Sequence, residues 1–307
     1  MKISVVLSTY NGEKYLLPQL DSLKNQTYPA DEVLIFDDGS TDQTVNLIDQ
    51  YISKNQLKNW KLSKNEKNIG WRKNFMEGIR KCTGDIIFTC DQDDIWNLSK
   101  IEKMKSVMEE DAQIGLLVSS YTEFYADNDR YLPTPCKKEE RKSCVRKIPL
   151  SKNILEVPYP GCTYCIRKEF FYICSLYWIE TCPHDALLWR SAMILGRAYL
   201  LEESMVLWRK HSTSAWQREV HTVSRQSELD WRNLERMELE KLRIFAQKQD
   251  ASLKATAIIE KNLKWCEMRT EFLRDKNTLV GINLIIFIEQ YHGLKRYIKD
   301  WLIAFTK

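Results

Sequence analysis

The sequence predicts an α/β fold in which a mostly parallel sheet carries helices on both faces, followed by a C-terminal helical region. Over the first third of the chain, short β-branched and aromatic runs alternate with segments of helical periodicity. Repeated strand, helix and strand units imply parallel pairing. Polar clusters follow the predicted strands, and ligands bind beyond the carboxyl ends of the strands in such sheets. From about Glu219 onward the pattern is helical.

Four strands and three helices are expected in order within the first 90 residues. The strands lie at residues 3–8, 33–36, 60–62 and 86–90, and the third gives the weakest pattern. Asn11 is placed to cap the first helix. Apolar residues at helical spacing mark the three helices: Leu16, Leu20 and Leu23; Val45, Ile48 and Ile52; Phe75 and Ile79.

Length and composition are ordinary for a globular protein. The 307 residues suit one large domain plus an appendage, or two domains, and we divide the chain at residues 1–218 and 219–307. The first part has halves at 1–110 and 111–218. A formal charge of +4 is too small to indicate nucleic acid as a partner. The apolar run near the N-terminus is too short for a signal peptide, so we expect a cytoplasmic protein.

Nine cysteines are scattered through the chain, often inside apolar runs, and buried reduced thiols explain them best. Cys162 and Cys165 have a spacing seen in zinc sites, whereas Cys174 and Cys182 lack a paired spacing. The pattern therefore disfavours zinc.

Three carboxylates follow the last of the four strands within four positions. Asp91, Asp93 and Asp94 come directly after residues 86–90 and therefore gather at one edge of the sheet. Carboxylates this close repel one another, and Mg²⁺ or Mn²⁺ would neutralise them because carboxylate oxygens are the ligands that these ions select. The alternative is an Asp-rich turn or helix cap, since Asp is a common turn residue.

Polar residues after the other strands suit parts of a nucleotide. Asp37 or Asp38 can accept a hydrogen bond from a ribose hydroxyl or a base imide. Gly39 and Gly70 permit turns in which a ligand approaches the backbone closely. The sequence lacks both a G-x-G-x-x-G after the first strand and a G-K-[ST] loop, which disfavours dinucleotide binding and P-loop chemistry. A diphosphate would therefore be held mainly through the metal.

Four segments in this order and at this spacing form a specific set: residues 8–12 with 15–16, residues 37–42, residues 68–70 and residues 91–94. Over the first 110 residues or so, the chain resembles the nucleotide-sugar-binding half of family 2 glycosyltransferases, which have the GT-A fold. The sequence of residues 91–96, Asp-Gln-Asp-Asp-Ile-Trp, is most similar to that of the bacterial branch of the family that includes rhamnosyltransferases of cell-wall and surface polysaccharides.

The resemblance implies that these segments bind a nucleotide-sugar donor and a divalent ion. By resemblance, Thr9 and either Asp37 or Asp38 would contact base and ribose, and Asp91 the nucleotide. Asp93 would bind the Mn²⁺ or Mg²⁺ that bridges the diphosphate, and the choice between Asp93 and Asp94 as main ligand stays open. The residues assigned to the donor in these segments are Thr9, Asn11, Asp37, Asp38, Asn68, Gly70 and Asp91.

Asp185 is a second candidate for chemistry. It stands at the start of an apolar helix, where its carboxylate could simply satisfy the first backbone amides. In the family that the chain resembles, an acidic residue in this Glu-Asp or His-Asp position is the catalytic base. The resemblance therefore implies that Asp185 is the base and that His184 orients it or contacts the acceptor.

A basic stretch follows the strand-like residues 198–201. In many members of the family a Tyr-Arg-x-His-Gly stretch closes the donor site, and here Trp208 and Ser212 replace its tyrosine and glycine. By resemblance, His211 would be a third metal ligand, the alternative being a surface histidine. Arg209 and Lys210 are assigned to the diphosphate, because charge-assisted contacts to phosphate are strong.

Taken together, the resemblance implies a metal-dependent, inverting glycosyltransferase. Its donor would be dTDP-rhamnose or a UDP-hexose, and its acceptor a hydroxyl of a glycan or lipid-linked glycan in bacterial surface polysaccharide or glycoprotein glycan synthesis. A sugar nucleotidyltransferase should carry a glycine-rich basic loop after the first strand, which residues 8–13 do not supply. A non-catalytic nucleotide-sugar-binding module would tolerate loss of an acid, yet the carboxylate cluster and Asp185 are both present.

The rest of the chain is less specific. Residues 115–199 should complete the sheet and form the acceptor side, with residues 127–147 as a charged loop, solvated rather than a mobile flap. Residues 279–288 are apolar but too short to span a bilayer. Residues 294–305 place an aromatic and aliphatic stripe beside basic residues, which suits either peripheral contact with the inner face of the cell membrane or packing on the domain or a homodimer partner. Five residues mark one apolar face of a helix before them: Ile259, Leu263, Cys266, Thr270 and Leu273.

Overall fold

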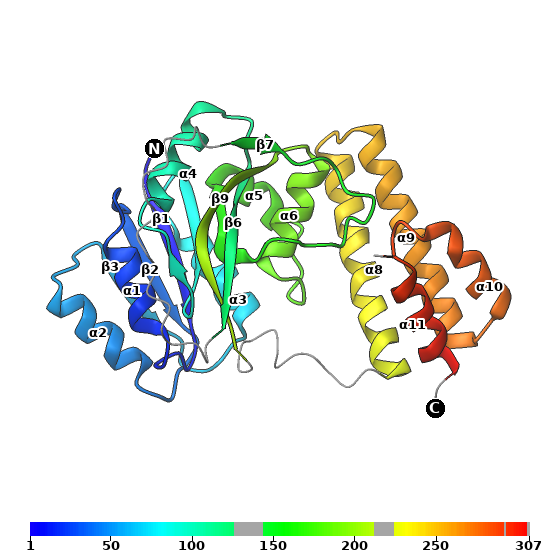
Figure 1. Ribbon diagram of the computed structural model, residues 1–307, viewed down its shortest axis with the longest axis horizontal. Coiled ribbons are helices and arrows are strands. Elements are labelled where there is room, and N and C mark those ends of the chain that lie inside the picture. Colours follow the sequence, from blue (N-terminus) through cyan, green and yellow to red (C-terminus); the bar gives the residue numbers. More distant parts are fainter. Residues whose placement is uncertain (126–143, 212–223, 292, 306–307) are drawn as a thin grey trace.

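The sheet and the helices on both of its faces form the left and centre of the molecule, and the C-terminal helices stand on one side of it (Figure 1). The computed structural model describes residues 1–125, 144–211, 224–291 and 293–305. The loop predicted at residues 127–147 therefore lies outside the described residues except for its end, where residues 145–147 form a short strand. The predicted boundary at residues 218 and 219 also lies outside them.

The described residues form one nine-stranded sheet, which confirms the predicted fold class. Its first four strands pair in parallel, and the other half is mixed, because β8 runs antiparallel between β4 and β6. In spatial order the strands are β3 (Trp60–Lys64), β2 (Glu32–Asp37), β1 (Ile3–Thr9), β4 (Ile86–Asp91), β8 (Tyr164–Arg167), β6 (Leu116–Tyr125), β9 (Ala198–Lys210) and β5 (Ile95–Trp96), with β7 (Val145–Lys147) paired to β9.

Alternate side chains of the central strands enter two separate hydrophobic cores. Val6 and Ile87 face one core and Val5 and Phe88 the other, as expected from the period of two along a strand. The first core is covered by α3 (Trp71–Lys81), α5 (Lys168–Ser175) and α6 (His184–Ile194), and the second by α1 (Leu16–Lys24), α2 (Thr44–Lys54) and α4 (Lys100–Glu110).

Two local predictions about this domain need correction. Asn11 does not cap α1, which begins at Leu16, because Asn11 has a left-handed φ of 46° in the preceding loop. The strand predicted at residues 198–201 continues to Lys210, because β9 pairs with β6 along its length across an irregular register. Residues 209 and 210 therefore lie on a strand, where neighbouring side chains point to opposite faces.

The C-terminal region is helical, as predicted. It consists of α8 (Arg225–Lys248), α9 (Leu253–Asp275), α10 (Thr278–Asn283), the 3₁₀ helix η2 (Leu284–Phe287) and α11 (Leu294–Phe305). Four of the five residues predicted to share a face of α9 are buried, and Thr270 is half-buried. None of the described helices combines the length and apolarity that crossing a bilayer requires.

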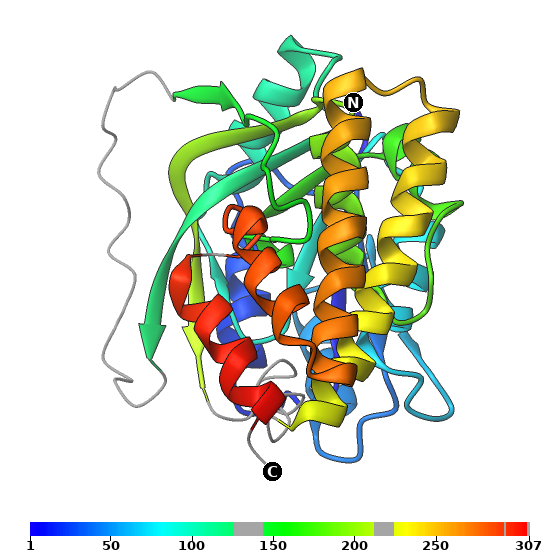
Figure 2. The ribbon, with the colours of Figure 1, turned by 90° about the vertical axis from the view of Figure 1, so that its right-hand side faces the viewer.

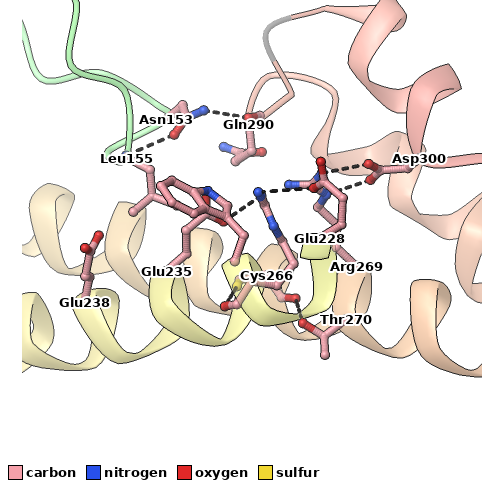
Figure 3. A network of polar contacts seen from close by, with 12 residues as sticks. Asn153, Leu155, Glu228, Glu235, Glu238, Cys266, Arg269, Thr270, Gln290 and Asp300 are labelled. Carbon is pink, nitrogen blue, oxygen red and sulfur yellow. Dashed lines mark hydrogen bonds and ion pairs between the residues drawn. The ribbon is translucent and has the colours of Figure 1, made fainter. Parts of the chain in front are cut away.

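A buried polar network connects these helices to one another and to the segment before η1 (Gly161–Thr163) (Figure 3). Arg269 of α9 donates two hydrogen bonds of 2.7 Å to Asp300 of α11, and the Tyr291 hydroxyl donates a third to the same carboxylate. Asn153 reaches the region from the other side, because its amide donates to the carbonyl of Gln290 at 2.7 Å. The helices are therefore held by specific paired groups as well as by apolar contacts.

We expect Asp300→Asn to lower the free energy of unfolding by about 3–5 kcal/mol, because it leaves the buried Arg269 guanidinium without its charge partner. Urea unfolding followed by tryptophan fluorescence measures this change, since Trp265 and Trp301 lie in the same cluster. Asp275→Asn is the matched control, because it removes an exposed pair with Arg274 and should have no measurable effect. Equal unfolding curves for the two variants would contradict the prediction.

Candidate active site

The candidate site lies at the carboxyl ends of β1, β2 and β4, where the loops after these strands are tied together. The backbone N–H of Tyr10 donates to Oε1 of Gln92 at 2.9 Å, and Nε2 of Gln92 donates back to the Tyr10 carbonyl at 3.1 Å. A Cβ at Gly12 would come within 2.1 Å of Oε1 of Gln92, so only glycine fits there without moving that amide. Gln92, which the sequence reasoning did not single out, thus holds the loop after β1 against residues 91–94. We call residues 91–94 the carboxylate turn.

Asp37 and Thr9 hold this group of loops together through hydrogen bonds. The Asp37 carboxylate is buried and accepts from the Thr9 hydroxyl at 2.9 Å and from the backbone N–H of Ser40 at 2.8 Å. Asn11 belongs to the same cluster, since its Oδ1 accepts from the backbone N–H of Thr41. The structure thus brings Thr9, Asn11 and Asp37 together, and their contact with a base or ribose stays a prediction.

Asp38 fastens the next loop in the same way. Its buried carboxylate accepts from the backbone N–H groups of Ile69 and Gly70, at 2.8 and 2.9 Å. Gly70 has a φ of 90°, which favours glycine, and its N–H also lies 3.0 Å from Oδ1 of the exposed Asn68. Asp38 therefore sets the path of the loop that carries Asn68 and Gly70, and donor binding by these residues stays a prediction.

The carboxylates after β4 are less well satisfied. Asp94 is fully buried, and one oxygen accepts from the backbone N–H of Arg209 at 2.9 Å while Oδ2 has no partner in the described structure. Burial and the nearby charge of Asp93 raise the pKa of Asp94 to about 7. Burial and the charges of Asp94 and Asp93 also raise the pKa of Asp91 well above its ordinary value. A cation at this position would relieve the repulsion.

Lys100 supplies a buried positive charge behind the carboxylates. Its ammonium donates to the carbonyl of Cys162 at 2.5 Å and lies 3.5 Å from the ring centroid of Trp96. Burial lowers the pKa of Lys100 to about 8, whereas its charge lowers the pKa of Asp94. Sequence reasoning missed this residue, although Lys100, Met104 and Met108 share the buried side of α4 at helical spacing and signal that helix.

Asp93 and His211 meet at the edge of the cluster. Nε2 of His211 lies 2.6 Å from Oδ2 of Asp93, and the imidazole ring packs against Tyr15 with centroids 5.0 Å apart. Nε of Arg209 donates to the carbonyl of Asp93 at 2.7 Å, so β9 holds the carboxylate turn through both its backbone and this side chain. The predicted residues Asp93, Asp94, Arg209 and His211 are therefore neighbours.

Lys210 points elsewhere. Its ammonium lies 3.3 Å from a carboxylate oxygen of Glu123 and 3.1 Å from the ring centroid of Trp208. Because side chains alternate along β9, Lys210 leaves the face of the strand from which Arg209 reaches Asp93. The structure thus separates the two residues that the sequence assigns to the diphosphate.

Asp185 approaches the cluster through η1. A Cβ at Gly161 would lie 3.3 Å from Cβ of Asp185, while the thiol of the next residue, Cys162, lies within 4.8 Å of ligand atoms of Asp91 and Asp94. The carbonyl of Gly161 accepts from the Thr89 hydroxyl of β4 at 2.6 Å, and the charge of Asp185 contributes to raising the pKa of Asp91. Asp185 also accepts from the adjacent backbone N–H of Ala186 at 2.7 Å, as the alternative role at a helix start predicts.

His184 is buried beneath this turn. Its ring stacks on Phe75 with centroids 4.1 Å apart, and neither of its ring nitrogens has a hydrogen-bond partner in the described structure. Burial lowers the pKa of His184, so the neutral imidazole is favoured. The ring thus supports the start of α6, and contact with an acceptor stays a prediction.

The donor atoms in the cluster fit a divalent cation. Within the described residues, ligand atoms of Asp91, Asp94 and Cys162 lie within 4.8 Å of one another. Burial raises the pKa of the Cys162 thiol well above its ordinary value, which disfavours the thiolate that binds metals. Hard ions also prefer oxygen ligands to sulfur. The carboxylates of Asp91, Asp93 and Asp94 are therefore better suited to Mg²⁺ or Mn²⁺ than Cys162 is, and metal binding by Asp93, Asp94 and His211 stays a prediction.

Comparison with known proteins places this site in a family. The model of a family described as "Glycosyl transferase family 2" matches residues 4–178. The dTDP-rhamnosyl transferase RfbG of Shigella flexneri is 30% identical over 224 residues, which cover 68% of this chain and 72% of RfbG. The poly(ribitol-phosphate) beta-N-acetylglucosaminyltransferase TarS of Staphylococcus aureus is 33% identical over 120 residues, covering 38% of this chain but only 21% of TarS.

Solved structures give the same fold. TarS residues 1–349 in complex with UDP superpose with a TM-score of 0.61 at 21% identity, covering 98% of this chain and 81% of that one. The mannosyltransferase PcManGT from Pyrobaculum calidifontis, in complex with GDP-Man and Mn²⁺, superposes with a TM-score of 0.53 at 14% identity, covering 100% of this chain and 81% of that one.

We expect the unliganded protein to lose stability as the pH rises from about 4 through 7, because the folded-state pKa of Asp94 lies near 7 and its unfolded value near 3.8. The folded state binds the extra proton in this range, so the loss is up to about 4 kcal/mol, complete once Asp94 is ionised. Chelator-treated protein unfolded in urea at pH 5 and pH 8 measures the part of this loss that falls above pH 5, about 3 kcal/mol. Asp94→Asn, which cannot titrate, should show a smaller loss, and an equal loss would contradict the assignment.

Proposed function

Because the chain belongs to glycosyl transferase family 2 and has the GT-A fold, we propose that it transfers a sugar from a nucleoside-diphosphate sugar to a hydroxyl group of a glycan or lipid-linked glycan. The observation that carries this proposal is that Asp185 lies against Gly161, whose carbonyl accepts a hydrogen bond from Thr89 of β4, two residues before Asp91. We take Asp185 as the proton acceptor beside a carboxylate cluster that suits a metal-bound diphosphate.

The donor that we propose is dTDP-rhamnose or a UDP-hexose. RfbG is named as a dTDP-rhamnosyl transferase, and a structure of TarS holds UDP-GlcNAc. A sheet edge with the Asp37 and Asp38 loops already fastened suits a base and ribose without large rearrangement. The acceptor belongs, in our proposal, to bacterial surface polysaccharide or glycoprotein glycan synthesis, since the AmsE relative of Erwinia amylovora is named for amylovoran biosynthesis.

Asp185 is the base in this proposal. Its carboxylate takes the proton of the acceptor hydroxyl, and the oxygen then attacks the anomeric carbon as the bond to the diphosphate breaks. A single displacement of this kind inverts the anomeric configuration. Asp185 is held for this role because α6 is fixed by the buried ion pair of Arg190 with Glu238 and by the ring of His184 beneath its first turn.

We propose Mn²⁺ or Mg²⁺ as the cofactor, bound by Asp93 and His211 with Asp91 and Asp94 nearby. Such an ion supplies electrostatic stabilisation of the negative charge that develops on the leaving diphosphate. Asp94, held by the Arg209 backbone, fixes the turn that presents Asp93. The guanidinium of Arg209, which also donates to the Asp93 carbonyl, stands close enough to this turn to add a charge-assisted contact to phosphate.

We expect Asp185→Asn to reduce the rate of sugar transfer by about 10²–10⁴-fold, because an amide cannot accept the acceptor's proton. Nucleotide binding should stay unchanged. Calorimetry with UDP and dTDP in the presence of Mn²⁺ measures it. Asp49→Asn, an exposed carboxylate on α2, serves as the matched control with normal turnover. Full transfer by the Asp185→Asn protein would remove this residue from the mechanism.

We expect Asp93→Asn and His211→Ala each to weaken Mn²⁺-dependent nucleotide binding by about tenfold or more, because each removes a proposed ligand of the metal ion. Cys162→Ser should change nucleotide binding by less than about threefold, since burial raises the pKa of the Cys162 thiol and disfavours the thiolate that binds metals. Calorimetric titration of UDP, dTDP and GDP with and without Mn²⁺ measures all three variants. The reverse ranking would assign the ion to the pocket of Asp91, Asp94 and Cys162.

A further inference from the structure

The C-terminal helices present large apolar side chains to solvent. In α10 and η2 the exposed residues are Leu279, Ile282, Ile285 and Ile286, with Leu279 71% and Ile286 66% exposed. Another four lie on α11: Leu294, Ile298, Leu302 and Phe305, each at least 47% exposed. Single exposed apolar residues are ordinary, whereas a group confined to the last 30 residues indicates a surface that something covers.

Helix α11 has two apolar sides, one buried and one largely exposed. Ile303 and Ala304 are buried against the rest of the C-terminal region, and Asp300 is paired with Arg269. The four exposed apolar residues recur at steps of four, four and three on the opposite side, where the ring of Phe305 also contacts Phe272 and Trp301. Because the inner side already anchors the helix, the outer stripe is not needed to hold α11 in place.

The two exposed groups belong to neighbouring helices. The hydroxyl of Tyr297 in α11 donates to the carbonyl of Gly281 in α10 at 3.0 Å. A Cβ at Gly281 would lie 2.7 Å from the ring of Trp301, so the two helices are in close contact. Figure 2 shows α10 and α11 side by side on the face turned toward the viewer. We name the eight exposed residues of α10, η2 and α11 the outer apolar face.

Basic side chains accompany this face. Lys295, Arg296 and Lys299 are exposed on α11, and Lys299 lies 3.9 Å from a carboxylate oxygen of Glu228 on α8. The one acidic residue of α11, Asp300, is buried in its pair with Arg269 and offers no charge to the outside. Apolar side chains bordered by Lys and Arg are the pattern of a helix that lies in the interface of an anionic membrane.

We propose that the outer apolar face docks on the surface of an anionic lipid bilayer. Leu294, Ile298 and Leu302 would enter the boundary between headgroups and acyl chains, and the lysines would contact lipid phosphates. A second copy of the chain fits less well, because a two-fold contact through α11 would bring the basic borders of both copies together. This proposal does not depend on the proposed sugar transfer.

Flotation of the purified chain with vesicles tests the proposal. Vesicles of phosphatidylcholine with about 30% phosphatidylglycerol should carry the protein at low salt, and pure phosphatidylcholine vesicles or high salt should carry much less. The double variant Ile298→Ser, Leu302→Ser should reduce binding about tenfold or more. Lys295→Glu combined with Arg296→Glu should reduce binding to the anionic vesicles alone.

Matched controls come from exposed positions elsewhere. Leu176→Ser with Leu253→Ser removes two leucines that are 80% and 90% exposed, and it should leave vesicle binding unchanged. Lys58→Glu with Lys61→Glu makes the same charge change at exposed positions just before and within β3 and should have little effect. Absence of wild-type binding, or unchanged binding after the Ile298 and Leu302 substitutions, would overturn the proposal. It would also be overturned if those substitutions instead converted a dimer to a monomer in light scattering.

Discussion

Repulsion among the carboxylates after β4 is the constraint on which the rest of the site depends. Two unit charges 4.8 Å apart repel by roughly 3 kcal/mol at an effective dielectric constant of 20, and Asp91 and Asp94 have ligand atoms within that distance. The fold offsets this repulsion with groups that are far apart in sequence. The Arg209 backbone reaches Asp94 from β9, and Lys100 lies behind the cluster on α4. The compensation is incomplete, since one Asp94 oxygen has no partner in the described residues.

Asp37 and Asp38, the acidic pair after β2, differ from the carboxylates after β4 because the protein supplies hydrogen bonds to all of their oxygens. Asp37 and Asp38 are also buried, yet both oxygens of each carboxylate accept hydrogen bonds from hydroxyl, amide or backbone N–H groups of the loops. These two residues therefore hold the loops after β1, β2 and β3 in one arrangement. Carboxylates satisfied by the protein stabilise it, whereas carboxylates left short of partners have free energy to gain from a cation. This contrast separates the acids that hold the loops from the acids that we propose bind a cation.

The sequence predicted the strands and the position of the polar clusters well, because apolar runs end where the chain leaves the sheet. It did not predict α4, and therefore missed Lys100, whose importance appears only when the helix is packed. Gln92 was also missed, because its role depends on a backbone 82 positions away. Arg209 and Lys210 were grouped together because strand alternation matters only once β9 is known to extend that far.

The C-terminal helices belong to the support of the site as much as to its surroundings. Leu239 and Phe245 of α8 and Ile259 of α9 share one hydrophobic core with the buried residues of α6. Arg190 of α6 pairs with Glu238 of α8 and also donates to the carbonyl of Leu155, so the helix that carries Asp185 is held by groups on both sides. A shift of α8 would therefore move the first turn of α6, and with it the distance between Asp185 and the carboxylate cluster. Any contact that orders the C-terminal helices thus also favours a fixed position of Asp185.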